Sequence, residues 1–305
     1  MAGPGQDQRS RAAAAALRHR MVRRIVAGGG LADPAWRAAF EEVPRHLFVP
    51  EYHRGSGEEG RYSADDPDPR RRLRWLTGAY ADQPIATHVS FGELVSSSSQ
   101  PSLMALMCEA LDVHEGHRVL EIGAGTGYNA ALIAHRLGGT GAVTTIDLEE
   151  AITDAARAHL AAYGTAEALA VTVVTGDGAS GYPPGAPYDR VMATCELPSI
   201  PPAWIAQCRT GALVLAPLAS GLVLLTVLGP ERAEGRFLST PAYFVPLRGR
   251  AAGIPPAAVG GEPSLLDRHP ARTRFGLSVE GRRQWIWLDR PDGPDTWPVP
   301  AASAY

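Results

Sequence analysis

Alternate glycines in one short turn and a distant acid are the residues of this chain whose spacing points most clearly to chemistry. An apolar run at Val119–Ile122 ends in Gly123–Gly127, which has glycine at every second position, and a second apolar run ends at Asp147. Glycine lets the backbone approach a ligand where a Cβ atom would collide, and a carboxylate can accept hydrogen bonds from both hydroxyls of a ribose. The spacing predicts a strand, a tight turn, a crossover helix and a second strand that bind a nucleoside at the carboxyl end of a parallel sheet.

The position of the third glycine favours S-adenosylmethionine as the ligand. A dinucleotide-binding turn reads G-x-G-x-x-G, so that a pyrophosphate lies on the helix N-terminus, whereas here the third glycine is Gly127 and Tyr128 follows it. The chain has no G-x-x-x-x-G-K-[ST] element, and Glu121, with no basic residue near it, disfavours a polyanion. An ordinary turn without a ligand is the alternative, but Gly176–Gly178 fits the same cationic, phosphate-free cofactor.

Apolar and amphipathic stretches predict the elements that position this turn and this acid. Six stretches are predicted as strands: 118–122, 142–147, 170–175, 190–194, 212–217 and 222–228. Helices are predicted near 128–137, 149–162 and 202–208. The alternation predicts an α/β fold with a doubly wound, Rossmann-like methyltransferase sheet, whose last two strands form an antiparallel edge.

The segment before this sheet is predicted to be mainly helical. Helices are expected over 9–27, from Asp33 to Pro44, and over 101–111, where Pro101 follows a run of serines. The polar stretch 53–74, with its runs of Asp and Arg, is predicted to be a loop insertion.

The end of the chain differs in composition from the rest. After about residue 250 the sequence becomes rich in Pro, Gly and Ala, and two further strands are predicted at 274–279 and 284–288. We therefore expect one domain over 1–250 and an appended β-rich extension over 251–305.

The overall composition is that of a globular protein. Of the 305 residues, 45% are hydrophobic and 20% charged, and the formal net charge of −3 gives no reason to expect a nucleic acid or a membrane as partner. No apolar run is long enough to span a bilayer, and no signal peptide is recognisable. The three cysteines, Cys108, Cys195 and Cys208, lack metal-ligand spacing, so we expect no metal and reduced thiols in a cytoplasmic protein.

Several segments coincide with the motifs of one family. They are Val43–Glu51 (V-P-R-H-L-F-V-P-E), Ser97–Pro101 (S-S-S-Q-P), Val119–Tyr128 (V-L-E-I-G-A-G-T-G-Y), Gly176–Gly178 (G-D-G), Ala186–Arg190 (A-P-Y-D-R) and Phe244–Leu247 (F-V-P-L). In this combination the chain resembles the protein-L-isoaspartate O-methyltransferases over roughly residues 12–250. The last of these segments matches the final core strand of the family.

The resemblance implies methyl transfer from S-adenosylmethionine to a carboxylate of a polypeptide. A carboxylate is already ionised at neutral pH, so the reaction needs orientation rather than a general base. Ser99 aligns with the serine that holds the substrate carboxylate, and Ser97 and Ser98 are the other candidates for this role. The alternative role for Ser99 is that of N-cap to the helix over 101–111.

The cofactor is expected to lie on the glycine turn and the two acidic segments. Asp147 is predicted to accept the ribose hydroxyls and Asp177 the adenine amino group, and Cys195 is predicted to be a packed thiol near the methyl group. The full set of expected cofactor contacts is Glu121, Gly123, Gly125, Thr126, Gly127, Asp147, Leu148, Gly176, Asp177 and Gly178.

Departures from the family pattern bear on the substrate. Family repair enzymes typically end near residue 250, and the family's T-I-S element is a serine run here, with Val95–Ser96 in place of Gly-Gln. A bacterial subgroup that resembles this arrangement modifies ribosomally synthesised peptides such as lanthipeptides, methylating an aspartate that collapses to aspartimide or isoaspartate. We therefore expect a modified precursor peptide as the substrate. General isoaspartyl repair is the alternative.

Two further classes of protein, and the role of three aromatic residues in the extension, stay open. A methyltransferase-like adaptor would bind without turnover, although a lysine-free chain is typical of high-GC bacteria. A small-molecule O-methyltransferase would lack the V-P-R and Ser-Gln-Pro segments. In the extension, Phe275, Trp285 and Trp287 are predicted either to contact the substrate peptide or to cover apolar surface of the core.

Overall fold

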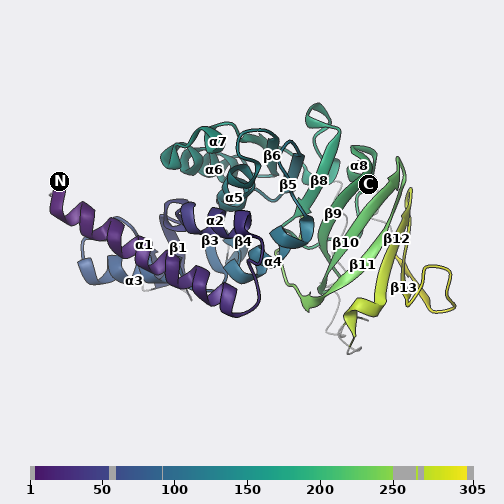
Figure 1. Ribbon diagram of the computed structural model, residues 1–305, viewed down its shortest axis with the longest axis horizontal. Helices are drawn as coiled ribbons and strands as arrows, with labels where there is room; N and C mark the ends of the chain where they lie inside the picture. The colour runs from purple at the N-terminus through teal and green to yellow at the C-terminus, as the bar shows by residue number, and fades with distance from the viewer. Residues whose placement is uncertain (1–3, 55–59, 91, 250–265, 267–270, 301–305) are drawn as a thin grey trace.

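The computed structural model describes residues 4–54, 60–90, 92–249, 266 and 271–300, which form two sheets flanked by helices (Figure 1). The described helices are α1 (Pro4–Ala27), α2 (Pro34–Glu42), α3 (Pro69–Ala79), α4 (Pro101–Leu111), α5 (Tyr128–Leu137), α6 (Glu150–Tyr163), α7 (Ala166–Leu169) and α8 (Pro202–Ala206). The smaller sheet has the order β2 (Arg61–Ser63), β1 (Glu51–His53), β3 (Ile85–Ser90), β4 (Glu93–Ser98). The larger sheet has the order β14 (Thr296–Val299), β13 (Arg283–Leu288), β12 (Phe275–Glu280), β11 (Arg232–Pro241), β10 (Gly221–Gly229), β9 (Cys208–Leu218), β8 (Tyr188–Ala193), β5 (Arg118–Ile122), β6 (Ala142–Asp147), β7 (Thr172–Thr175).

The parallel half of the larger sheet confirms the predicted doubly wound α/β arrangement. Strands β9, β8, β5, β6 and β7 pair side by side in parallel. Val119–Ile122 is buried on both faces of central strand β5, as expected for an apolar run without alternation. The carboxyl ends of β5 and β6 therefore lie side by side, with Ile122 opposite Ile146, and this brings the glycine turn next to Asp147.

The predicted antiparallel pair of β9 and β10 is present, but it is not the edge of the sheet. Strand β11 pairs with β10, and β12, β13 and β14 continue the sheet beyond it. Strand β11 was not predicted because only Ala233 and Phe237 of its residues are buried. The described strands of the extension thus belong to the same sheet as the cofactor fold and lie at the far end of the molecule from α1 (Figure 1).

The polar stretch over 53–74 is not simply a loop, contrary to the sequence prediction. It contributes strand β2 and the first turns of α3, while residues 55–59 lie outside the described part of the chain. Asp68 caps α3 by accepting a hydrogen bond from Arg70 N, and Pro69 follows at the first helical position. The helix was not predicted because it begins with a run of arginines. The residues that α3 buries, among them Trp75, Leu76 and Ala79, lie in its second half.

The segment Phe244–Leu247, expected to be the last core strand, forms only an isolated bridge between Glu196 and Pro246. Glu196 N donates to Val245 O, and Leu247 N donates to Glu196 O. Pro246 has no N–H group with which to extend a ladder. The segment is therefore an extended strap across the carboxyl ends of the strands.

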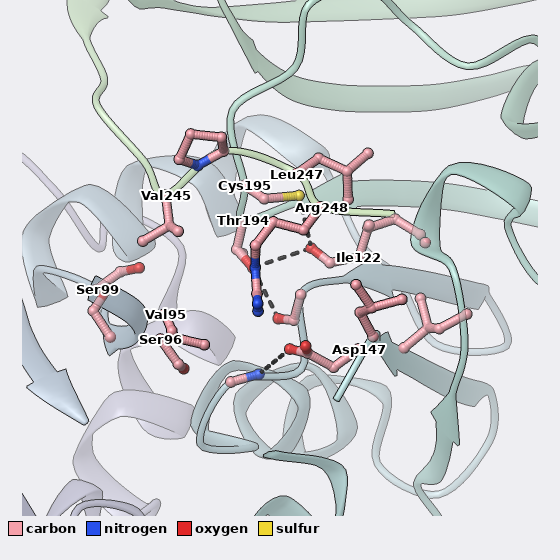
Figure 2. A pocket seen from close by; sticks show the side chains of 17 residues that line it. Val95, Ser96, Ser99, Ile122, Asp147, Thr194, Cys195, Val245, Leu247 and Arg248 are labelled. Atoms are coloured by element: carbon pink, nitrogen blue, oxygen red, sulfur yellow. Dashed lines mark hydrogen bonds between the residues drawn. The ribbon is translucent and has the colours of Figure 1, made fainter. Parts of the chain in front are cut away.

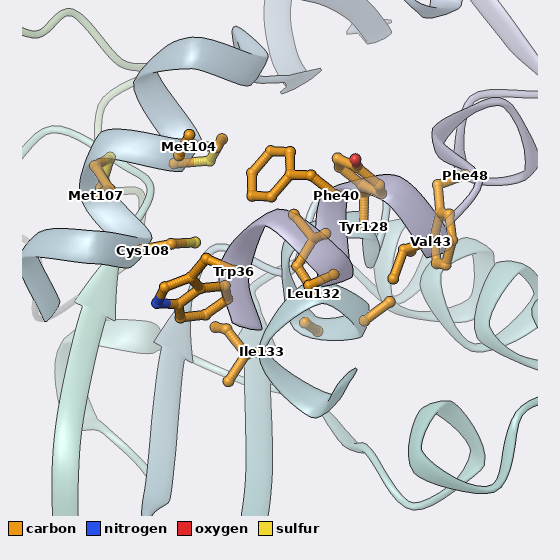
Figure 3. Close-up of a cluster of buried hydrophobic side chains, with 14 of the residues drawn as sticks. Trp36, Phe40, Val43, Phe48, Met104, Met107, Cys108, Tyr128, Leu132 and Ile133 are labelled. Carbon is orange, nitrogen blue, oxygen red and sulfur yellow. The ribbon is translucent and has the colours of Figure 1, made fainter. Parts of the chain in front are cut away.

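Helices α2, α4 and α5 enclose a buried cluster beneath the parallel strands (Figure 3). Trp36 and Phe40 of α2 face Tyr128 and Leu132 of α5, and all four side chains are almost fully buried. Phe40 meets Tyr128 edge-on with ring centroids 6.4 Å apart. This packing fixes α5 and hence the turn that begins it. Within the described part of the chain, no helix has both the length and the apolarity needed to cross a bilayer.

Candidate active site

The backbone of the turn after β5 favours glycine at each of its three positions. Gly123, Gly125 and Gly127 have φ values of 98°, 50° and 80°, a region that other residues rarely adopt. A Cβ atom on Gly123 would lie 2.6 Å from Thr194 Oγ1, and one on Gly127 would lie 3.3 Å from Ala156 O on α6. The first glycine thus keeps the turn open beside β8, and the third lets α6 approach.

One pocket lies over this turn at the carboxyl ends of β5, β6 and β8 (Figure 2). Its lining comprises Val95, Ser96, Ser97, Ser99, Ile122, Gly123, Gly125, Ile146, Asp147, Leu148, Gly178, Thr194, Cys195, Val245, Pro246, Leu247 and Arg248. Ser96 and Ser99 lie on one side of the pocket and Asp147 on the other (Figure 2). The structure therefore brings Gly123 and Gly125 of the predicted turn, the predicted ribose acid Asp147, and Ser97 and Ser99 of the serine run to a single cavity, whereas Gly127 lies outside its lining.

Asp147 is tied directly to the glycine turn. Gly125 N donates a hydrogen bond to Asp147 Oδ2 over 3.1 Å. Burial raises the pKa of the Asp147 carboxyl, and backbone N–H groups, that of Gly125 first, oppose the rise. The carboxylate is partly withdrawn from water at the pocket wall, where a ligand bearing hydroxyl donors would satisfy it.

Glu121 lies outside the pocket lining, although it was predicted to contact the cofactor. Its carboxylate is 1% exposed and accepts hydrogen bonds from Asn129 Nδ2 and Thr145 Oγ1, both over 2.7 Å. Burial raises the pKa of Glu121 to about 7. The Glu121 side chain thus links β5 to α5 and β6, the elements on either side of the glycine turn.

Of the other predicted cofactor contacts, some line the pocket and some lie outside it. Leu148 and Gly178 line the pocket, whereas Gly176 N donates to Asp147 O and thereby holds the two strand ends together. Asp177 Oδ1 accepts from Ala179 N, and the Gly249 backbone lies directly against this carboxylate. Asp177 is therefore next to the pocket but outside its lining.

Thr126 faces a neighbouring hollow rather than the main pocket. That hollow shares Ser96 and Gly125 with the main pocket and also contains His88 and His159. The Thr126 carbonyl lies 2.9 Å from His159 Nδ1. Ser96 and Gly125 therefore form the boundary that the two cavities share.

The serine run ends strand β4 and divides between two environments. Ser97 and Ser99 line the pocket, whereas Ser98 is 4% exposed and its hydroxyl accepts from Arg45 Nη2 over 3.1 Å. Ser99 does not cap α4: the N-cap position is Gln100, and the N–H of Ser102 is satisfied by Asp82 Oδ1. Within the described residues, Ser99 Oγ makes no hydrogen bond, so its hydroxyl is available to a ligand in the pocket.

The segment that follows β8 contributes Thr194 and Cys195 to the lining of the pocket. Thr194 Oγ1 donates to backbone carbonyls, with Ile122 O at 3.1 Å and Gly123 O at 2.9 Å (Figure 2). Burial raises the pKa of the Cys195 thiol, which is therefore neutral at physiological pH. This agrees with the prediction of a packed thiol rather than a nucleophile.

Arg248 is a pocket residue that sequence reasoning missed. It follows the Phe244–Leu247 strap and forms an ion pair with Glu149, two residues after Asp147. Its charge also lowers the pKa of Asp147, against the effect of burial. Its position directly after the F-V-P-L segment was the only available signal, since the ion pair joins residues far apart in the chain.

Among the described residues, no group of three or more His, Cys, Asp or Glu side chains is arranged to hold a metal ion. The features that the pocket does offer are an open glycine turn, a carboxylate for hydroxyl donors and a hydroxyl wall. These fit S-adenosylmethionine.

Comparison with known sequences gives one consistent result. A family model described as protein-L-isoaspartate(D-aspartate) O-methyltransferase matches residues 72–250. A protein-L-isoaspartate O-methyltransferase 1 from Archaeoglobus fulgidus is 34% identical over 212 residues, which are 70% of this chain and 84% of that protein. Its namesake from Rhodopseudomonas palustris is 37% identical over 240 residues, 77% of this chain and 84% of that protein.

Solved structures show the same fold. One named protein-L-isoaspartate O-methyltransferase has a TM-score of 0.62 at 23% identity and covers 94% of this chain and 88% of its own. That share exceeds what residues 1–250 make up, so the likeness in fold reaches into the extension. A Plasmodium falciparum structure described as a protein-L-isoaspartate O-methyltransferase in complex with S-adenosyl-L-homocysteine has a TM-score of 0.57 at 14% identity and covers 77% of this chain and 98% of its own. The chain belongs to the protein-L-isoaspartate O-methyltransferase family and is an S-adenosylmethionine-dependent carboxyl methyltransferase.

Proposed function

We propose that this enzyme methylates the free carboxylate of an isoaspartyl residue in a polypeptide, the first step of isoaspartyl repair. The observation that carries the proposal is that Ser99, with an unengaged hydroxyl, shares one pocket with Asp147 and the glycine turn. The relatives reported above are named as protein-L-isoaspartate O-methyltransferases, which favours repair over the peptide modification expected from the sequence.

The pocket has the composition that carboxylate methylation requires. When bound, S-adenosylmethionine supplies an electrophilic methyl group on a sulfonium. Ser99 Oγ donates a hydrogen bond to one carboxylate oxygen and orients the other toward the methyl carbon. As the new C–O bond forms, the methyl–sulfur bond breaks, so no proton needs to be removed from the substrate. Accordingly, no histidine is found among the residues that line this pocket.

Modification of a ribosomal peptide remains a second candidate for one structural reason. The positions at which the serine run departs from the family pattern include Ser96 and Ser97, and both line the pocket. The departure therefore changes the wall that faces the substrate carboxylate rather than a remote surface. The extension alone does not favour this candidate, because the likeness to a structure bearing the repair-enzyme name extends beyond residue 250.

Three substrates distinguish the candidates. Methyl transfer from labelled S-adenosylmethionine is measured on an isoaspartyl peptide, on the same peptide with normal aspartate, and on a ring-bearing lanthipeptide with one aspartate. Repair predicts efficient methylation of the isoaspartyl peptide alone. Methylation confined to the lanthipeptide would replace repair by peptide modification, and binding of cofactor without turnover on any of the three would contradict both enzymatic proposals.

A further inference from the structure

Arg45, from the V-P-R segment, is a buried cation directly behind the serine wall of the pocket. It begins the short 3-10 turn Arg45–Phe48, and its side chain is 0% exposed. Although the sequence resemblance singled out its motif, the cofactor site described above does not use it.

The guanidinium joins two segments that form separate parts of the structure. Arg45 Nη1 donates to Ala79 O over 2.7 Å and to Ala81 O over 3.4 Å, at the end of α3. Arg45 Nη2 donates to Ser98 O, Ser98 Oγ and Ser99 O, at 3.2, 3.1 and 3.0 Å. One side chain thus fixes both the backbone of the serine run and the segment next to it.

The acceptors of this guanidinium are all uncharged. Within the described part of the chain Arg45 forms no salt bridge, and its Nε is buried without a partner. Burial lowers the pKa of Arg45 to about 10, which still leaves it protonated at neutral pH. Burying a charge is costly, and the Asp82 carboxylate favours the charged form of Arg45 without forming an ion pair with it. Only a guanidinium has enough N–H donors to reach the acceptors in both segments at once, because an amide has two.

We propose that Arg45 is a positioning residue for methyl transfer: it holds Ser98 and Ser99 so that Ser99 Oγ faces the pocket, and its positive charge favours entry of the anionic substrate carboxylate. The inference rests on the proposed role of Ser99 as the substrate contact. It assigns Ser98 a different role from the one the sequence predicted, because the Ser98 hydroxyl serves Arg45 rather than the substrate.

The test compares Arg45→Lys, Arg45→Gln and Ser98→Ala in the full-length protein. Arg45→Lys keeps the charge without the planar fork, and Arg45→Gln keeps a donor without the charge. Misplacing a reacting group by about 1 Å costs on the order of 100-fold in rate, so we expect kcat/KM for an isoaspartyl peptide to fall on that scale in Arg45→Gln and less in Arg45→Lys. Ser98→Ala removes one acceptor and should show a smaller loss of the same kind.

Cofactor affinity and a matched arginine provide the controls. Binding of S-adenosylhomocysteine by calorimetry should stay within about threefold of the wild type, a difference of less than 1 kcal/mol. Arg118 also donates to a backbone carbonyl, that of Gly185, but lies outside the pocket lining. Arg118→Lys should therefore leave kcat/KM for the peptide and the affinity for S-adenosylhomocysteine unchanged. If Arg45→Gln does not fold, Ser98→Ala and Arg45→Lys carry the test.

The outcomes separate this inference from the proposal about Ser99. Full turnover in Ser99→Ala together with a large loss in Arg45→Lys would reject the serine contact and, with it, the route by which Arg45 acts. If Ser99→Ala is slow and the double variant with Arg45→Lys is no slower than the worse single variant, Arg45 acts through Ser99. Equal losses of cofactor affinity and peptide turnover, or a lower Tm with unchanged kcat/KM, would overturn the positioning role.

Discussion

Gly125 donates its backbone N–H to Asp147 Oδ2 over 3.1 Å, so the turn after β5 and the acid after β6 are held together as one unit. The bond depends on the turn conformation at position 125, where a φ of 50° favours glycine, and on the parallel register that sets Ile122 opposite Ile146. The two features that stood out in the sequence are therefore parts of a single binding surface, and each can be tested through the other.

Replacing Asp147 by Ala should abolish measurable cofactor binding. Ribose hydroxyls buried without an acceptor cost roughly 1–3 kcal/mol each, and the turn also loses the acceptor for Gly125 N. Because burial raises the pKa of Asp147, affinity should weaken as pH falls through this raised value and Asp147 becomes protonated. Calorimetry with S-adenosylhomocysteine at several pH values checks both effects, and unchanged affinity in the variant would reject the assignment.

Glu121→Gln should leave cofactor affinity unchanged and alter the pH dependence of stability. The pKa of Glu121 is about 7 in the fold against an ordinary value of 4.5, so the folded state binds more protons between these values and stability declines as pH rises through that window. Gln remains neutral, and the Thr145 hydroxyl can accept as well as donate. The variant should therefore match or exceed the wild-type Tm at pH 8, and its advantage should shrink toward pH 5; a loss of cofactor binding would instead restore Glu121 as a contact.

Ser99→Ala should slow methyl transfer without changing cofactor binding. A hydrogen bond to a charged group contributes roughly 1.5–3 kcal/mol, so kcat/KM for the isoaspartyl peptide should fall about 10- to 100-fold. Ser97→Ala is the matched variant on the same wall. If Ser97→Ala is the slower of the two, the role of holding the carboxylate belongs to Ser97.

The glycine turn and Asp147 could be predicted from sequence because their signals are local, whereas Glu121, Thr126, Gly127, Gly176 and Asp177 were predicted as contacts and lie outside the pocket lining. The apolar run, the glycines and Asp147 follow one another along the chain, and all three glycines have the positive φ that favours this residue. The serine wall was found only as a motif: strand β4 is too polar to be recognised, and nothing near Ser98 in the sequence indicates that its hydroxyl faces Arg45. Arg248 was missed for the same reason, since its partner Glu149 lies far away in the chain.

The ion pair of Arg248 with Glu149 should control how long the cofactor stays bound. It joins the residue that follows the Phe244–Leu247 strap, Arg248 of the pocket lining, to the segment after Asp147. Arg248→Gln and Glu149→Gln should each speed dissociation of S-adenosylhomocysteine in stopped-flow measurements. Arg157→Gln, which removes an exposed ion pair with Asp154 on α6, is the control. Equal rates in all three variants and the wild type would show that the ion pair does not hold the strap closed.

Removal of the extension should destabilise the fold. Strand β12 pairs with β11 over five residue pairs, and Phe275, Leu277 and Val279 are buried in the same apolar cluster as Phe237. Truncation after residue 250 would expose that cluster and the β11 edge, so we expect aggregation or loss of the fold. A soluble truncated protein that still binds the cofactor would contradict this expectation.

Two tryptophans of β13 separate a structural role of the extension from a role in substrate binding. Trp287 is 2% exposed, donates through Nε1 to Ser278 Oγ and lies against Gly276, whereas Trp285 is only partly buried beneath Arg283. Trp287→Ala should lower the free energy of unfolding by about 3–5 kcal/mol, and Trp285→Ala should change it much less. If Trp285→Ala keeps wild-type stability but raises KM for a peptide substrate, the extension contacts substrate; if KM is unchanged, the extension serves only to complete the sheet, and the specificity of the enzyme lies in the serine wall.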